Sequence, residues 1–365
     1  MGGGLTPRHT LRIALTLLAA LGGALGCVWL GTPIPWMLGP LLVTGLASVL
    51  GAPTASASIL RNAGQWVIGA ALGLYFTPQV GALLVQLWWA ILLGVVWALA
   101  LGALFSLWLA HRHADDLSHL SPTEFRATTY FASAIGGASE MTLLAERAHA
   151  RTDLVAAAHS LRLVMVVMTL PFAMQWAQHH WGLTVDASLR PAPGLVDGAG
   201  LLALAAATLL GGLVMRWLGR TNPWFMGALL VAMGVSLLNL QWSAVPVWLS
   251  NTAQLVIGVS LGVRFRREFV TTAPRWMASV AIGTVVMMVL CLLFGLAMAS
   301  LTDLHPATLI LGTSPGGITE MAITAKVLQL GAPVVTAFQV SRLVAVLVLA
   351  APVFDWLQSR AGRQE

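Results

Sequence analysis

The sequence predicts an all-α protein that crosses a membrane many times and is built from two related halves. The first observation is composition, because 58% of the 365 residues are hydrophobic and only 9% are charged. Soluble domains are about one quarter charged, and those residues cover their surface. The second observation is a set of long apolar runs, and the third is a series of motifs that recurs in the same order. Together they predict helices immersed in lipid.

The long apolar runs predict membrane-spanning helices. Leu83 to Leu109 and Trp276 to Ala299 both exceed the roughly 20 residues that a helix needs to cross about 30 Å of hydrocarbon. The run that follows Arg8 and Arg12 continues to about Leu30, and further helical segments come after it. We therefore expect this run to be the first spanning helix rather than a cleaved secretory signal.

Charge and cysteine usage narrow the possible partners. The formal net charge is +6, but the 19 Lys and Arg residues are scattered over loops without a continuous basic stripe, so we expect no nucleic-acid partner. Cys27 and Cys291 lie in apolar segments without metal-site spacing, and we expect no metal and no cofactor. No nucleophile, base and orienting group can be assembled, so we expect neither an enzyme nor catalytic residues.

Four pairs of motifs indicate an internal duplication. The pairs are "PWMLGPLLV" from Pro35 and "PWFMGALLV" from Pro223, "QWVIGAALGLYF" from Gln65 and "QLVIGVSLGVRF" from Gln254, "SAIGGASEM" from Ser133 and "TSPGGITEM" from Thr313, and "SLRLV" from Ser160 and "VSRLV" from Val340. The offset between paired starts runs from 180 (Ser133 to Thr313) to 189 (Gln65 to Gln254). We predict a first membrane repeat over residues 1–187 and a second over 194–365, joined by a linker.

The topology depends on the segments that contain the glycine pairs. Each half has five apolar segments that can span, plus one such segment, which is less apolar. If these two segments cross the membrane, twelve spans result and the Lys and Arg of the loops divide eight to nine between the sides. If they enter and leave on one side as re-entrant hairpins, ten spans result and the second half is inverted relative to the first.

In the re-entrant arrangement, with Arg162 and Arg342 set aside as intramembrane, the other 17 basic residues divide fifteen to two. The fifteen on the first side are Arg8, Arg12, Arg61, Arg112, Arg126, Arg147, Arg151, Arg216, Arg220, Arg264, Arg266, Arg267, Arg275, Arg360 and Arg363, and the two on the other are Arg190 and Lys326. The positive-inside rule favours this arrangement. We therefore predict two inverted repeats, each of about five transmembrane helices plus one broken or re-entrant hairpin, with both chain termini in the cytoplasm.

The repeated glycine pairs predict the tips of the two hairpins. Non-helical backbone at membrane depth is tolerated only where it is buried in protein or lines a watery cavity. Glycine permits the left-handed or extended conformations of a tip, and its missing Cβ lets a ligand approach the backbone. The residues after each tip would begin a helix, whose free N–H groups favour an anion.

We predict that the two tips and their matched polar residues form a substrate- or ion-binding site. The candidate residues are Gly136, Gly137, Ser139, Glu140, Gly316, Gly317, Thr319, Glu320, Gln65, Gln254, Arg162 and Arg342. The glutamates would be carboxylates of the translocation site, the arginines their candidate paired cations, and the glutamines a polar lining.

Structural interpretations of the same residues stay open. Each glutamate could cap the first turn of its own helix beside a kink. The G-x-x-x-G spacings at Gly69/Gly73 and Gly258/Gly262 are typical of close helix packing.

At these motifs the chain resembles the AbrB family of bacterial inner-membrane proteins. The family's hallmark is a tandem membrane repeat with a P-W-x-x-G opening, the Q-x-x-x-G-x-x-x-G segment and G-G-x-x-E-M, and both copies of each occur here. The first copy departs from the second in having Ile135 where the second has Pro315. Members carry the labels of a regulator of the aidB gene or of an ammonia monooxygenase. The resemblance implies a multi-pass protein of the bacterial inner (plasma) membrane and identifies no substrate.

The function that we expect is a secondary transporter or exporter of a small, anionic or zwitterionic solute, coupled to protons or sodium. No Walker A sequence is present to indicate ATP as the energy source. Any regulation of gene expression would then be indirect. The alternative is a membrane-embedded sensor or regulator that binds a ligand without moving it. The expected partners are the solute, a coupling ion and the lipid bilayer, and whether the protein forms a homo-oligomer is left open.

Overall fold

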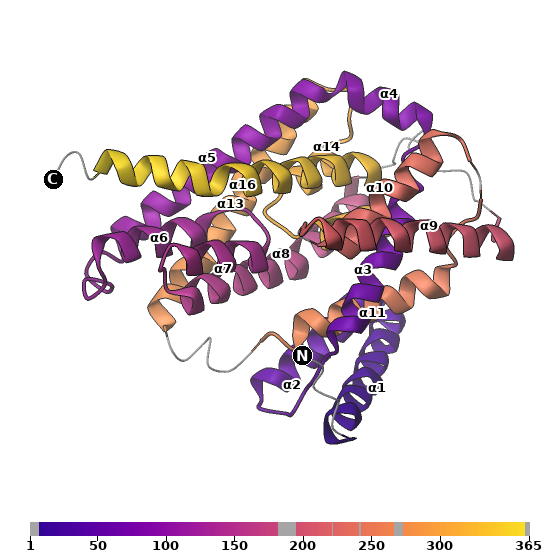
Figure 1. Cartoon of the computed structure of the whole chain (residues 1–365), viewed down its shortest axis with the longest axis horizontal. Coiled ribbons are helices and arrows are strands. Elements are labelled where there is room, and N and C mark those ends of the chain that lie inside the picture. The colour runs from indigo at the N-terminus through magenta and orange to yellow at the C-terminus, as the bar shows by residue number, and fades with distance from the viewer. Residues whose placement is uncertain (1–6, 182–194, 221, 241, 266–272, 362–365) are drawn as a thin grey trace. The chain divides into compact units, whose positions relative to one another are not determined.

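The computed structural model describes residues 7–181, 195–220, 222–240, 242–265 and 273–361, and within these ranges the chain forms fifteen helices and no strands (Figure 1). The predicted linker near 187–194 lies outside the described residues. In chain order the helices are α1 (Pro7–Trp29), α2 (Pro35–Val49), α3 (Ser58–Gly73), α4 (Pro78–Gln86), α5 (Trp88–Arg112), α6 (Pro122–Ser133), α7 (Ala138–Arg147), α8 (Thr152–Trp181), α9 (Gly198–Trp217), α10 (Pro223–Leu237), α11 (Val247–Gly262), α13 (Pro274–Ala299), α14 (Pro306–Thr313), α15 (Ile318–Val327) and α16 (Ala332–Ala361).

Six of the described helices are long and apolar enough to cross a membrane, namely α1, α5, α8, α9, α13 and α16. They form three matched pairs in the two halves, and the predicted all-α polytopic membrane class is confirmed. The other four expected spans are shorter. Helices α2, α10 and α11 have 15 or 16 residues, and α3 continues into α4 through a bend of 85°. At about 1.5 Å per residue these helices fall short of about 30 Å.

The chain forms two compact units, and each unit takes segments from both sequence halves. Unit 1 consists of residues 1–85, 170–268 and 322–333, and unit 2 of residues 86–169, 269–321 and 334–365. Residues 1–187 and 194–365 are therefore halves of the sequence that interleave in the fold. Several matched helices of the two halves fall into the same unit, as α1 and α9 do in unit 1 and α5 and α13 do in unit 2.

Backbone contacts at glycine hold unit 1 together. A Cβ on Gly39 of α2 would overlap the backbone of Gly23 of α1, and a Cβ on Gly227 of α10 would overlap Gly211 of α9. The G-x-x-x-G motifs make the contacts between the halves, since Gly69 of α3 abuts Phe225 O of α10. These contacts confirm the packing interpretation of those glycines, because any side chain there would force the helices apart.

The motif in the second half makes the reciprocal contact. Gly258 of α11 abuts Met37 O of α2, and a Cβ on Gly258 would lie 2.5 Å from that oxygen. Unit 1 thus contains two helix pairs that each join the two sequence halves: α3 packs on α10, and α11 packs on α2.

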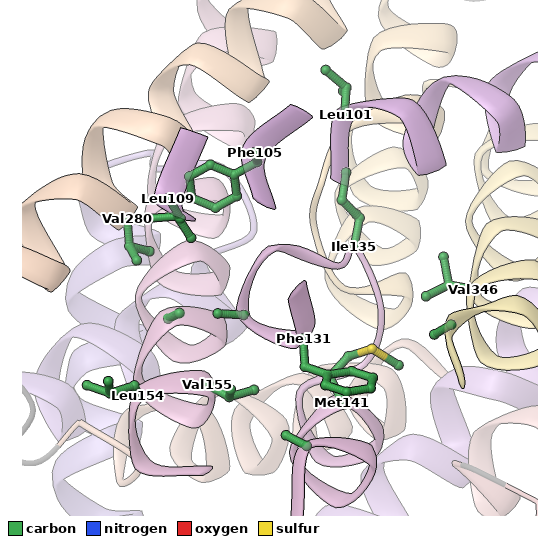
Figure 2. Packing of buried hydrophobic residues seen from close by; sticks show 14 of the residues in the cluster. Leu101, Phe105, Leu109, Phe131, Ile135, Met141, Leu154, Val155, Val280 and Val346 are labelled. Atoms are coloured by element: carbon green, nitrogen blue, oxygen red, sulfur yellow. The ribbon is translucent and has the colours of Figure 1, made fainter. Parts of the chain in front are cut away.

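The core of unit 2 lies beside the first glycine pair. Phe131 of α6 and Met141 of α7 are buried together below the tip, and Ile135 at the tip points toward Leu101 of α5 (Figure 2). Val155 of α8 belongs to the same buried cluster. Gly136 and Gly137 are themselves half-buried, so the apolar cluster packs against one side of the tip and does not enclose it.

Candidate functional site

The first glycine pair lies where the chain reverses direction. Helix α6 begins at Pro122, where Ser121 Oγ accepts from Glu124 N at 3.2 Å, and the helical backbone ends at Ala134 (φ −53°, ψ 134°). Helix α7 then starts from Gly137, whose carbonyl accepts from Met141 N at 2.9 Å. Beyond α7, Arg151 N donates to Thr128 Oγ1 in the middle of α6 at 3.0 Å. The chain thus returns toward the side from which it came, as a hairpin does.

The second glycine pair has the same local construction. Helix α14 begins beside His305, whose Nδ1 accepts from Ala307 N at 3.2 Å, and it ends at Ser314 (φ −60°, ψ 147°). Helix α15 starts from Gly317, whose carbonyl accepts from Met321 N at 3.1 Å. The backbone breaks at matched positions in both halves, so the second hairpin repeats the first.

An arginine and a histidine of α8 clamp the first tip. Arg162 donates from Nη1 to Ser133 O at 3.3 Å and from Nη2 to Ala134 O at 2.9 Å. His159 Nε2 lies 2.9 Å from Phe131 O, and its Nδ1 lies 2.8 Å from Arg162 Nη2. Because a guanidinium can only donate, Nδ1 is the acceptor and Nε2–H donates to the carbonyl. The network therefore assigns a neutral imidazole to His159.

Helix α16 clamps the second tip with the matched residues. Arg342 donates from Nη1 to Ser314 O and from Nη2 to Gly316 O, the latter at 2.7 Å. Gln339 stands where the first half has His159, and its Nε2 donates to Leu311 O at 2.8 Å and to Ser314 O at 3.2 Å. Each clamp satisfies carbonyl groups that a helix leaves without partners at its C-terminus, where a positive charge is also favoured.

The clamps change the role that the sequence suggested for the arginines. We expected Arg162 and Arg342 to pair with Glu140 and Glu320, but the described hydrogen bonds of both guanidinium groups go to tip carbonyls and, for Arg162, also to His159. The arginines are 4% and 5% exposed. Their position at the ends of α6 and α14 therefore makes them caps that hold the breaks.

The glutamates lie over the starts of their own helices. A Cβ on Gly137 would overlap the carboxylate of Glu140, and one on Gly317 would overlap that of Glu320. Each glutamate stands three residues after the glycine that precedes its helix, which is the position of a capping-box carboxylate. Glu320 is 7% exposed and Glu140 is half-buried. The geometry thus favours the capping interpretation for where the carboxylates sit.

The other glycine of each pair makes room for a methionine. A Cβ on Gly136 would lie 2.9 Å from Met141 Cε, and one on Gly316 would lie 2.8 Å from Met321 Cγ. Both methionine side chains are fully buried. In G-G-x-x-E-M the first glycine therefore accommodates the methionine and the second the glutamate. None of these four glycines has a positive φ, so close approach rather than a left-handed backbone requires them.

The remaining candidates fall into both units. Thr319 is buried beside Glu320 in unit 2, whereas Gln65 and Gln254 lie on α3 and α11 in unit 1. The side chain of Ser139 lies outside the described part of the chain. Sequence reasoning missed His159 and Gln339. Both stand three residues before the matched arginines and on the same helical face, and the 180-residue offset aligns them.

The fold and the site define a polytopic all-α membrane protein with two duplicated, clamped helix hairpins. The sequence profile of one family matches residues 36–358, and its description reads "Transition state regulatory protein AbrB". The chain therefore belongs to the AbrB family. It is also 25% identical over 364 residues to "Uncharacterized protein YhjN" of Bacillus subtilis (strain 168), and the match covers 92% of this chain and 90% of that protein. No solved structure matches the chain.

Proposed function

We propose that the protein is a secondary transporter of a small anionic or zwitterionic solute, coupled to protons or sodium ions. The observation that carries the proposal is the pair of matched hairpin tips in unit 2. Both break at glycines, both are clamped by a buried arginine, and both place a glutamate in the first turn of the second helix. Many secondary transporters bind their substrate and ion at such duplicated breaks.

The breaks supply both signs of partial charge within a few residues. The N-terminus of α7 or α15 presents N–H groups, and the C-terminus of α6 or α14 presents carbonyl groups. A buried arginine fixes the carbonyl side in each hairpin, so that the position of the break is held while a ligand enters or leaves. Such a site stabilises an anionic group without requiring a metal.

The capping position of the glutamates is compatible with coupling. A carboxylate that caps a helix accepts hydrogen bonds from backbone N–H groups, whereas its protonated form accepts fewer and gains a donor. Binding or release of a proton at Glu140 or Glu320 would therefore alter the start of α7 or α15. This mechanism ties the ionisation of the glutamate to the shape of the tip.

The test of transport uses purified protein in proteoliposomes. Flux of a panel of labelled amino acids and carboxylic acids is measured with an imposed proton gradient, a sodium gradient or neither. We expect gradient-driven flux for at least one solute, and a Glu140→Gln, Glu320→Gln double variant that inserts normally but loses the dependence on the gradient. Flux of every solute that is independent of both gradients, or wild-type coupling in the double variant, contradicts the proposal.

A membrane sensor is the second candidate function. The observation that favours it is the description of the matching family, which names a regulatory protein. A sensor of this kind would bind its ligand at the same tips and transmit the change to a partner protein. Stoichiometric recovery of one signalling partner with the purified full chain, combined with no flux in the transport assay, would favour this candidate.

We propose the bacterial inner membrane as the location, with both termini in the cytoplasm. The support is the fifteen-to-two division of basic residues in the re-entrant arrangement, together with the return of the chain at Arg151 to the middle of α6. Single cysteines at Arg151 and at Arg190, which lies outside the described residues, test the orientation. A membrane-impermeant thiol reagent should label the second from outside and not the first. Labelling of the first cysteine and not the second would support the arrangement with twelve spans.

A further inference from the structure

The second tip contains a buried acceptor and a buried donor without partners. Among the described residues, Gln339 Oε1 and Arg342 Nε are enclosed and make no hydrogen bond. The side chain of Gln339 is fully buried and that of Arg342 is 5% exposed. An unpaired buried polar group costs about 1–3 kcal/mol, and native proteins leave few of them. Two such atoms on one turn of α16 therefore call for a ligand that pairs with both.

Hydrogen bonds fix the direction of each group. Gln339 Nε2 uses its two hydrogens on Leu311 O and Ser314 O, so the opposite atom of the amide is the oxygen, an acceptor. Arg342 uses Nη1 and Nη2 on Ser314 O and Gly316 O, which leaves Nε–H as a donor. Both side chains contact Ser314 O, so the unpaired acceptor and donor lie in the same small region beside the second tip.

The charge of Arg342 restricts the ligand further. Its described partners are carbonyl oxygens, which carry only partial negative charge. A buried cation without an anionic partner is unfavourable, and a ligand carboxylate would neutralise it. A carboxylate alone offers no hydrogen to Gln339 Oε1, however. The ligand must also carry a donor close to its carboxylate.

The first tip lacks these unpaired groups. There His159 replaces the glutamine, its Nδ1 accepts from Arg162 Nη2 at 2.8 Å, and its Nε2 pairs with Phe131 O. Both ring nitrogens are therefore occupied by groups of the protein itself. The two hairpins share a backbone construction, but only the second leaves an acceptor of this side chain for a ligand.

We propose that Gln339 and Arg342 form a subsite for a small carboxylate with a hydroxyl or ammonium group on the adjacent carbon. A carboxylate oxygen accepts from Arg342 Nε, and the hydroxyl or ammonium donates to Gln339 Oε1. The inference rests on the proposed function in that it names the substrate class and places the substrate at the second tip.

The experiment measures binding to the purified full chain in detergent by isothermal titration calorimetry. The probes are L-lactate, L-alanine and propionate, which share a carboxylate and differ in the donor on the adjacent carbon. We expect lactate or alanine to bind at one site per chain. Propionate should bind roughly tenfold more weakly or worse, because it leaves Gln339 Oε1 unpaired. Equal binding of all three, or no binding of lactate and alanine, overturns the assigned class.

The first tip provides the design of the decisive variant. Gln339→His gives the second tip the pair of side chains that the first tip already has, so it should fold while its ring accepts from Arg342. We expect affinity to fall roughly tenfold or more. Gln339→Met removes the acceptor without a ring and should give the same loss. The matched control His159→Gln makes the reciprocal change at the first tip and should leave this affinity unchanged.

The results separate the subsite from the transport function. Wild-type affinity in folded Gln339→His or Gln339→Met overturns the subsite, whatever the flux assay gives. Normal selective binding that these variants abolish, combined with no flux under any gradient, supports the subsite and contradicts only the transport proposal. Binding in detergent needs no gradient, so the two failures are distinguishable.

Discussion

The two hairpin tips perform the same structural task with partly different side chains. Both end a helix inside the protein, both hold the terminal carbonyl groups with an arginine, and both fit a methionine and a glutamate against a glycine pair. They differ at His159 and Gln339, and at Ile135 and Pro315. The shared residues meet needs of the broken backbone. The differing residues show where each copy has freedom to serve a separate purpose.

The arginine clamps should show the largest difference in stability. Arg162→Ala removes the hydrogen bonds to Ser133 O and Ala134 O, and an unpaired buried carbonyl costs about 1–3 kcal/mol. We therefore expect the free energy of unfolding to fall by about 4 kcal/mol. Arg342→Ala removes the donor to Gly316 O, whereas Ser314 O still accepts from Gln339. We therefore expect the free energy of unfolding to fall by about 2 kcal/mol. Thermal unfolding in detergent measures both. A larger loss for Arg342→Ala would contradict this account of the clamps.

The residue before each glycine pair gives the next largest contrast. Ile135 is 2% exposed in the core of unit 2, so Ile135→Ala should create a cavity and cost about 3 kcal/mol (Figure 2). Pro315 is also buried, so Pro315→Ala should leave a smaller cavity as well as increase the freedom of the unfolded chain, and it should cost about 2 kcal/mol. Chemical denaturation of the two variants in one detergent provides the comparison. Equal losses would mean that the tips are anchored in the same way.

A double-mutant cycle tests what the second glycine of each pair accommodates. Gly137→Ala and Gly317→Ala should each cost about 1 kcal/mol, because the added Cβ displaces the glutamate carboxylate from its capping position. In the Glu140→Ala background, Gly137→Ala should become nearly neutral. In the Glu320→Ala background, Gly317→Ala should keep part of its cost, since its Cβ would also lie 3.2 Å from Leu163 Cδ1. Additive losses within either pair would show that glycine and glutamate do not interact.

Much of this architecture could be predicted from sequence patterns. The composition and the long apolar runs indicate the six long helices, and the matched motifs locate both breaks to within a residue or two of Ala134 and Ser314. These features depend on local sequence or on the repeat. The interleaving of the halves could not be predicted, because packing of α3 on α10 depends on which glycine faces which backbone.

The details of the site were less accessible to prediction for a physical reason. A buried arginine needs partners, but the sequence does not distinguish a carboxylate from a set of carbonyl groups as the partner of Arg162. The structure assigns carbonyls, because the end of α6 points at that side chain. His159 could not be singled out from the sequence, because a single histidine on an apolar helix is usually a packed core residue. Its alignment with Gln339 becomes informative only once the clamps are seen.

The smallest expected effect lies in the loop that leads into the first hairpin. Asp116 accepts from His113 Nδ1 at 3.1 Å and from Arg275 Nη1 at 3.2 Å, and these two groups, His113 foremost, lower the pKa of its carboxyl. A carboxyl with a lowered pKa contributes stability above its unfolded-state pKa, and the contribution disappears as the pH falls through the folded-state pKa. The carboxyl is exposed to solvent, so screening keeps this contribution small.

Asp116→Asn should therefore lower the melting temperature slightly at neutral pH, and the difference from wild type should shrink as the pH falls from about 5 through the lowered folded-state pKa. Asp303 is the matched control, because it occupies the equivalent place before the second hairpin, is exposed, and has no ion-pair partner among the described residues. Asp303→Asn should leave the melting temperature unchanged at either pH. If the two variants behave alike across this range, the contact with His113 and Arg275 does not stabilise the entry to the first hairpin, and the two loops are equivalent.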